Sequence, residues 1–169
     1  TSAWEGNALC QQRYQELGLT NYRQLQSHFI KEIGEFLASK GKKMAMWNES
    51  ITASGADLDM MRETGATVYC WNPCQSGAKK AAEMGLPNVV TEYSNGYYIN
   101  RKQWAKGEPT GAGYGTDNLE TVYNYVPVPS NTSSTLLKYY TGVQGTFWTE
   151  HVANREYMEY LALPRLLAV

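Results

Sequence analysis

The chain has 169 residues, with 15 basic and 16 acidic side chains and a net charge of −1. This length suits one ordinary domain, and the balanced charge offers no basic field for phosphate groups, so nucleic acid is not expected as a partner. No apolar run approaches the length that spans a bilayer. The three cysteines and two histidines are too scattered for a zinc ligand set, so neither a metal nor another cofactor is expected.

The composition is rich in amphipathic aromatic side chains, with 13 Tyr and 5 Trp against 3 Phe. Such rings are typical of surfaces where flat apolar faces meet polar ligands. A tyrosine-rich core gives the same composition. The positions of the rings along the chain therefore have to decide between the two.

The first half of the chain predicts helices that alternate with short apolar strands. Residues 1–20 are interpreted as a loop with a short helical piece. A helix follows from Asn21 to Gly41, because apolar residues recur at helical spacing between a capping residue and a glycine stop. The elements predicted next are a strand at 42–47, a helix at 56–63, a strand at 66–71, a helix at 76–84 and a strand at 88–93.

The second half is less regular. Residues 101–117 contain four glycines and Pro109, which predicts a long loop of a kind that is usually functional or disordered. Short helices are predicted at 119–125 and 133–140, a strand at 142–150 and a final helix at 154–167.

This alternation predicts an α/β fold, with about four parallel strands buried on both faces and covering helices. Four such units make half of an eight-stranded (β/α) barrel. A half-barrel leaves two unpaired sheet edges, so we expect the chain to continue beyond these residues. We also expect self-association of the piece through the exposed edges.

Aromatic residues with polar neighbours follow the predicted strands. The groups are, in chain order, Trp47 with Glu49, Trp71, Tyr98 with Asn100, and Trp148 with Glu150. Alternation along a strand predicts that Trp148 and Glu150 point the same way. Ligands of such folds bind at the carboxyl ends of the strands. An indole wall beside a carboxylate acceptor suits a sugar ring.

These residues, in this order, resemble glycoside hydrolase family 20, the β-N-acetylhexosaminidases. The resemblance covers nearly all 169 residues. Its segments are Trp47-Asn48-Glu49, Trp71, Tyr98-x-Asn100, Val122-Tyr123-Asn124-Tyr125-Val126-Pro127, Gly142-Val143-Gln144, Trp148-Thr149-Glu150 and Pro164-Arg165. It implies that residues 1–169 are a single partial catalytic domain, truncated at its N-terminus. That domain would be the C-terminal half of a TIM-type (β/α)8 barrel, with barrel strands 5 to 8 and their helices.

The resemblance also implies roles for individual residues. Trp47, Trp71 and Trp148 would wall the pocket around a terminal N-acetylhexosamine. Tyr98 would donate to the acetamido oxygen and so orient the group that reacts. Glu150 would accept hydrogen bonds from sugar hydroxyls far from the scissile bond.

Asn48 and Asn100 stand where the family pattern has acids. An amide still donates and accepts hydrogen bonds, but it carries no negative charge. The substitution at Asn100, which belongs to the implied substrate-binding set, is therefore expected to change hydroxyl preference or affinity. The substitution at Asn48 weakens the expectation of full activity at the usual optimum.

The family mechanism is substrate-assisted and retaining: the 2-acetamido oxygen attacks the anomeric carbon, an Asp orients the acetamido nitrogen, and the adjacent Glu is the general acid/base. This sequence contains no Asp-Glu dipeptide. The implied function is therefore part of a hydrolase for terminal β-linked GlcNAc or GalNAc. The chain would supply sugar-binding walls, and the isolated fragment would be inactive.

Two alternatives remain. Glu49 and Glu150 could form a retaining pair, which requires carboxyl groups roughly 5–5.5 Å apart. The chain could instead be a non-catalytic carbohydrate-binding or structural module. The expected partner of a sugar site is an oligosaccharide or glycoconjugate that ends in N-acetylhexosamine. Family analogy suggests an exported protein of the periplasm, the cell surface or a lysosome-like compartment.

Overall fold

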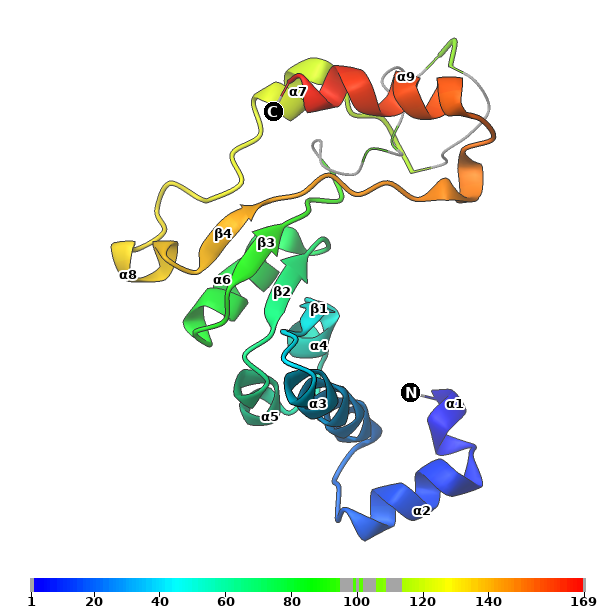
Figure 1. Ribbon diagram of the computed structural model, residues 1–169, viewed down its shortest axis with the longest axis vertical. Coiled ribbons are helices and arrows are strands. Elements are labelled where there is room, and N and C mark those ends of the chain that lie inside the picture. The colour runs from blue at the N-terminus through cyan, green and yellow to red at the C-terminus, as the bar shows by residue number, and fades with distance from the viewer. Residues whose placement is uncertain (1, 95–98, 100, 102–105, 109–113, 169) are drawn as a thin grey trace.

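A four-stranded parallel sheet forms the centre of the computed structural model, which describes residues 2–94, 99, 101, 106–108 and 114–168 (Figure 1). The strands are adjacent in chain order: β1 (Ala45–Trp47), β2 (Thr67–Cys70), β3 (Asn88–Val90) and β4 (Tyr140–Val143). This sheet confirms the predicted α/β class and its parallel strands.

Helices connect the strands and extend the molecule at both ends, so that the two termini lie at opposite ends of an elongated shape (Figure 1). They are α1 (Ser2–Glu5), α2 (Ala8–Glu16), α3 (Tyr22–Ser39), α4 (Glu49–Thr52), α5 (Leu58–Glu63), α6 (Cys74–Glu83), α7 (Leu119–Tyr123), α8 (Ser134–Leu137), the 3-10 helix η1 (Thr149–His151) and α9 (Arg155–Leu166). Asn21 caps α3 by accepting from the N–H groups of Arg23 and Gln24, as predicted. Within the described residues, no helix is long and apolar enough to cross a membrane.

Four stretches differ from the predicted elements. Residues 2–16 form two helices instead of a loop with one short helical piece, because the Asn7 side chain accepts from the N–H groups of Leu9 and Cys10 and so starts α2. Helix α4 was not predicted, since its four residues show no helical periodicity. The predicted helix at 133–140 is shorter, and Tyr140 already belongs to β4. The strand predicted over 142–150 ends at Val143.

One face of the sheet is covered. Met46, Val68 and Val90 point into a core with side chains from α4, α5 and α6. The alternate residues Trp47 and Tyr69 occupy the other face, where they are exposed or half-buried. The prediction that the strands are buried on both faces is therefore wrong for the described residues, because their helices pack against a single face.

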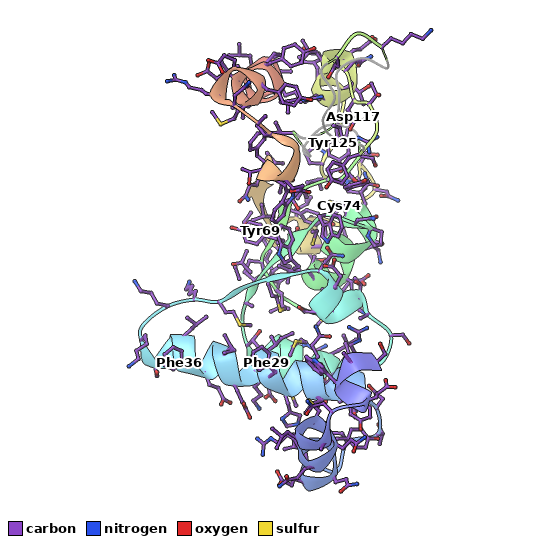
Figure 2. All side chains as sticks on the ribbon, turned by 90° about the vertical axis from the view of Figure 1, so that its right-hand side faces the viewer. Phe29, Phe36, Tyr69, Cys74, Asp117 and Tyr125 are labelled. Atoms are coloured by element: carbon purple, nitrogen blue, oxygen red, sulfur yellow. The ribbon has the colours of Figure 1, made fainter. Side chains whose placement is uncertain are left out.

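Cys70 and Cys74 lie in this core as free thiols; Figure 2 labels Cys74 close to Tyr125. The Cys74 thiol donates to the Cys70 carbonyl oxygen at 2.8 Å. Burial raises the pKa of Cys74 to about 12 and that of Cys70 still further. A thiol that stays protonated is a poor metal ligand. The described part of the chain contains no group of three or more His, Cys, Asp or Glu that could hold a metal ion.

A smaller core lies beyond the carboxyl ends of the strands, beneath α9. Ile99, Tyr157 and Leu161 form its centre, and Phe147 and Val152 pack against them. Phe147 immediately precedes Trp148 in the chain. The second core therefore anchors the segment that leads from β4 to α9.

Candidate functional site

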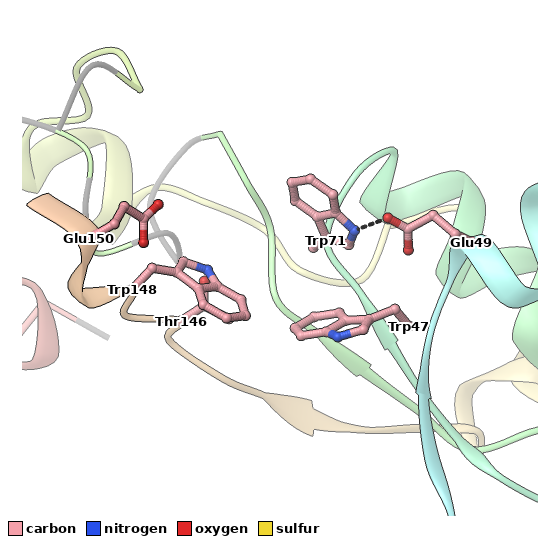
Figure 3. Close-up of a pocket in the computed structure, with 6 residues that line it drawn as sticks. All are labelled: Trp47, Glu49, Trp71, Thr146, Trp148 and Glu150. Carbon is pink, nitrogen blue, oxygen red and sulfur yellow. Dashed lines mark hydrogen bonds between the residues drawn. The ribbon is translucent and has the colours of Figure 1, made fainter. Parts of the chain in front are cut away.

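A pocket of about 340 Å³ lies at the carboxyl ends of the strands. Its lining residues are Trp47, Glu49, Trp71, Thr146, Trp148 and Glu150 (Figure 3). Residues from three of the four groups predicted at strand ends thus come together around one cavity. The fourth group, Tyr98 with Asn100, lies outside the described residues.

The indoles form the walls of this pocket. The ring centroids of Trp47 and Trp148 are 6.2 Å apart, and their planes are inclined by 41°. The side chains of Trp47 and Trp148 are 39% and 43% exposed, so each still presents ring surface to the cavity. Trp71 contacts the Tyr93 ring edge-on, at 5.6 Å between centroids. The arrangement offers apolar faces in more than one orientation.

Glu49 fixes the orientation of Trp71. The indole Nε1–H of Trp71 donates to Oε1 of Glu49 at 2.5 Å (Figure 3). Glu49 is the first residue of α4, directly after the end of β1. This unpredicted helix turn therefore aims the carboxylate across the pocket mouth at the end of the neighbouring strand.

Asn48 joins the ends of β1 and β2 beneath the pocket. Its side chain is 0% exposed; Oδ1 accepts from the Trp71 N–H at 3.0 Å and Nδ2 donates to the Asn72 carbonyl oxygen at 3.3 Å. A Cβ on Gly77 would come within 3.1 Å of this side chain, so a larger residue there would require Asn48 to shift. Asn48 does not line the cavity. Its contacts indicate that it positions the backbone of Trp71.

Trp148 and Glu150 reach the pocket by a different route from the one predicted. Since β4 ends at Val143, the strand that was predicted to carry and orient these two residues does not reach them. Trp148 has extended backbone angles and precedes η1, which carries Glu150. Both residues nevertheless line the pocket. A turn of 3-10 helix, and not a strand, brings the carboxylate to the cavity.

Two contact residues were missed by the sequence interpretation. Thr146 is 6% exposed and lines the pocket, while its carbonyl oxygen accepts from the Ile99 N–H at 2.9 Å. The Tyr114 hydroxyl donates to Oε1 of Glu150. The only available signal for Tyr114 was its place in the glycine-rich stretch 101–117, which was interpreted as a long loop of a kind that is usually functional or disordered.

The two carboxylates occupy opposite ends of the pocket. In Figure 3 Glu49 turns toward Trp71, Glu150 lies on the far side of Trp148, and the indoles of Trp47 and Trp148 stand between them. The arrangement suits binding of a ring across its width better than it suits two carboxylates that act on one carbon atom.

The sequence profile of glycosyl hydrolase family 20, catalytic domain, matches residues 1–169. The chain belongs to glycosyl hydrolase family 20. This match confirms the family that the ordered set of aromatic and acidic residues resembles.

Relatives within family 20 align with almost the whole chain. The β-hexosaminidase of Porphyromonas gingivalis is 34% identical over 171 residues, which cover 98% of this chain and 20% of the relative. The β-hexosaminidase of Vibrio furnissii is 29% identical, with 98% of this chain and 26% of the relative covered. The chain thus spans between about a fifth and a quarter of the length of these curated relatives.

Solved structures of family 20 share the fold. An inactive variant of an exo-β-N-acetylglucosaminidase from Vibrio harveyi superposes with a TM-score of 0.80 at 29% identity, over 98% of this chain and 25% of that one. A β-N-acetylhexosaminidase from Bacteroides fragilis gives a TM-score of 0.77 at 22% identity, over 98% and 32% of the two chains. These matches confirm that the described sheet and helices belong to the barrel type of the family.

Proposed function

We propose that the protein containing this chain removes terminal β-linked N-acetylhexosamine from oligosaccharides or glycoconjugates. The observation that carries the proposal is the pocket, in which three indoles and two carboxylates meet at the carboxyl ends of parallel strands. Indole faces bury the apolar C–H face of a sugar ring, and carboxylates accept hydrogen bonds from its hydroxyls. Membership of family 20 supports the same substrate class.

Each pocket residue has a role in this proposal. Trp47, Trp71 and Trp148 enclose the ring, and Glu150 accepts from hydroxyls far from the scissile bond. Tyr114 donates to Oε1 of Glu150 and would hold the carboxylate in the orientation in which it meets the sugar. Tyr98 would orient the acetamido group, with Asn100 as a further contact.

The proposed chemistry is substrate-assisted. The acetamido oxygen attacks the anomeric carbon while the glycosidic bond breaks, and a glutamic acid gives its proton to the leaving oxygen. Water then attacks the same carbon, gives its proton to that glutamate and restores the acetamido group. The orienting Asp and the acid Glu would come from residues outside these 169, since the sequence has no Asp-Glu dipeptide.

The complete protein is expected to release 4-nitrophenol from 4-nitrophenyl N-acetyl-β-glucosaminide or its galactosamine epimer. The 169-residue chain alone, shown to be folded by circular dichroism, is expected to be at least about a hundredfold slower, because a general acid contributes that much or more. Inactivity of the complete protein on every β-N-acetylhexosaminide would contradict the proposal. Sedimentation of the isolated chain tests the related proposal that it self-associates through its β1 and β4 edges.

Replacement of Glu49 separates this proposal from the retaining-pair alternative. The Gln of Glu49→Gln still accepts from the Trp71 indole, so kcat is expected to stay within about threefold of wild type, whereas Glu49→Ala loses the contact and lowers kcat/KM about tenfold. In a two-carboxylate retaining mechanism, a Gln side chain cannot replace the carboxylate that acts as the nucleophile. A loss of about 10⁴-fold or more in the Gln variant, measured as initial rates, would therefore support the pair and reject a purely positioning Glu49.

A further inference from the structure

Arg165 is a charged residue that lies buried in the protein interior. This residue of α9 is 1% exposed, and its guanidinium donates to the carbonyl oxygens of Ile99 at 3.0 Å, Asp117 at 3.0 Å, Leu161 at 2.9 Å and Arg101. Burying a cation is unfavourable unless its donors are satisfied. Three of these acceptors belong to the segment between β3 and α7, far from α9 in the chain. The contacts thus tie that segment to the helix.

The same segment contains a second cation, which is partly buried. Nε of Arg101 lies 2.6 Å from Oδ2 of Asp117, and the two side chains are 14% and 6% exposed. Arg101 also donates to the carbonyl oxygen of Tyr114. Gly115 has a φ of +97°, which favours glycine, and a Cβ there would meet the Arg101 guanidinium at 2.6 Å and require it to move. The backbone around Tyr114 is therefore held by Arg101, whose own carbonyl is held by Arg165.

Two contacts connect this scaffold to the pocket. The Tyr114 hydroxyl donates to Glu150, and the Ile99 N–H donates to the carbonyl oxygen of Thr146. Thr146 and Glu150 both line the cavity. A continuous series of hydrogen bonds thus runs from the guanidinium of Arg165 to the Glu150 side of the pocket.

We propose that Arg165 is a positioning residue for the sugar pocket, and that it acts by holding Tyr114 against the carboxylate of Glu150. The proposal rests on the proposed function for the identity of the ligand. Tyr114 donates to one oxygen of Glu150 and so fixes the orientation in which the carboxylate faces the sugar. Arg165 touches neither the pocket nor its ligand.

The variants Tyr114→Phe, Arg165→Lys and the double variant test this coupling in the complete protein. Binding of N-acetylglucosamine is followed by tryptophan fluorescence, and KM and kcat are measured with the chromogenic glucosaminide. Tyr123→Phe is the matched control for the hydroxyl, since Tyr123 is 74% exposed. Arg155→Lys is the control for the cation, since the Arg155 side chain lies on the same helix and is 81% exposed.

Each single variant is expected to raise Kd and KM about tenfold with kcat within about threefold of wild type, and the controls to change neither. In the double variant the increase is expected to stay near tenfold, because both changes remove the same contact. An increase of about a hundredfold, with the two effects multiplied, would overturn the proposal, as would an unchanged Kd in Arg165→Lys.

Amide hydrogen exchange gives a readout that needs no ligand or activity. Arg165→Lys is expected to speed exchange of the Ile99 N–H about tenfold while the Val68 N–H, bonded to Pro87 in the sheet, keeps its rate. Equal acceleration at both amides would show general destabilisation and reject a positioning role. If the wild type neither binds nor hydrolyses the sugar, the proposed function fails, and the Ile99 exchange still decides the role of Arg165.

Discussion

Trp148→Ala is expected to lower kcat/KM of the complete protein for a β-N-acetylhexosaminide by about 30- to 1000-fold, equivalent to about 2–4 kcal/mol for a central aromatic contact. The indole of Trp148 faces Trp47 at 6.2 Å between centroids, so its loss removes one wall and the neighbour of another. Initial rates with the chromogenic glucosaminide measure the effect. Most of the loss should appear in KM, because the indole binds the ring and does not transfer a proton.

Trp4→Ala provides the matched control for this loss. Trp4 lines a separate pocket between α1, α2 and α3, and not the pocket at the strand ends. Its replacement is expected to leave kcat/KM within about threefold of wild type, as for a residue without contact to the substrate. Equal losses in both variants would show that Trp148 acts through stability alone. An unchanged rate in Trp148→Ala would contradict the placement of the sugar beside this indole.

Asn48→Ala is expected to lower the free energy of unfolding by about 2–4 kcal/mol, since a buried group without a partner costs about 1–3 kcal/mol. The substitution leaves both the N–H of Trp71 and the carbonyl of Asn72 without the amide that now bonds them. It also opens a gap beneath Gly77, which packs against this side chain. Urea denaturation followed by circular dichroism measures the change.

Asn131→Ala is the control for this stability change. Asn131 is exposed in the turn that precedes α8, and its replacement is expected to alter the free energy of unfolding by no more than about 0.5 kcal/mol. A cost below about 1 kcal/mol for Asn48→Ala would mean that water or a shifted backbone replaces both hydrogen bonds. The role assigned to Asn48, as the tie between the ends of β1 and β2, would then be wrong.

The sequence could predict those residues of the candidate site whose positions follow from the order and direction of the strands alone. Trp47 is the last residue of β1 and Trp71 follows β2, and the apolar runs of both strands are easily recognised. Because neighbouring strands are parallel, their carboxyl ends meet at one edge of the sheet whatever the exact length of each strand. Trp148 was placed correctly although β4 ends earlier than predicted, because the connection from its last residue is short and leads to the same edge. An error of a few residues in a predicted strand boundary therefore does not change which edge of the sheet a following residue reaches.

Contacts through irregular backbone could not be predicted. Tyr114 and Glu150 are 36 residues apart, and no periodicity links a glycine-rich stretch to a turn of 3-10 helix. Arg165 was noted only as part of a motif. Sequence patterns place an arginine in a helix on the solvent side by default, since arginines are rarely buried without partners. Its hydrogen-bond acceptors here are backbone carbonyls, and a sequence pattern does not show which carbonyls a side chain will reach.

The strand order of the sheet bears on how the chain folds during synthesis. Each strand pairs with the one made just before it, so β1 to β4 can assemble in succession as the chain leaves the ribosome. Arg165 breaks this pattern, because it bonds to a carbonyl 66 residues earlier in the chain and is made after all four strands. We expect the sheet to form first and the Glu150 side of the pocket to mature only when α9 docks.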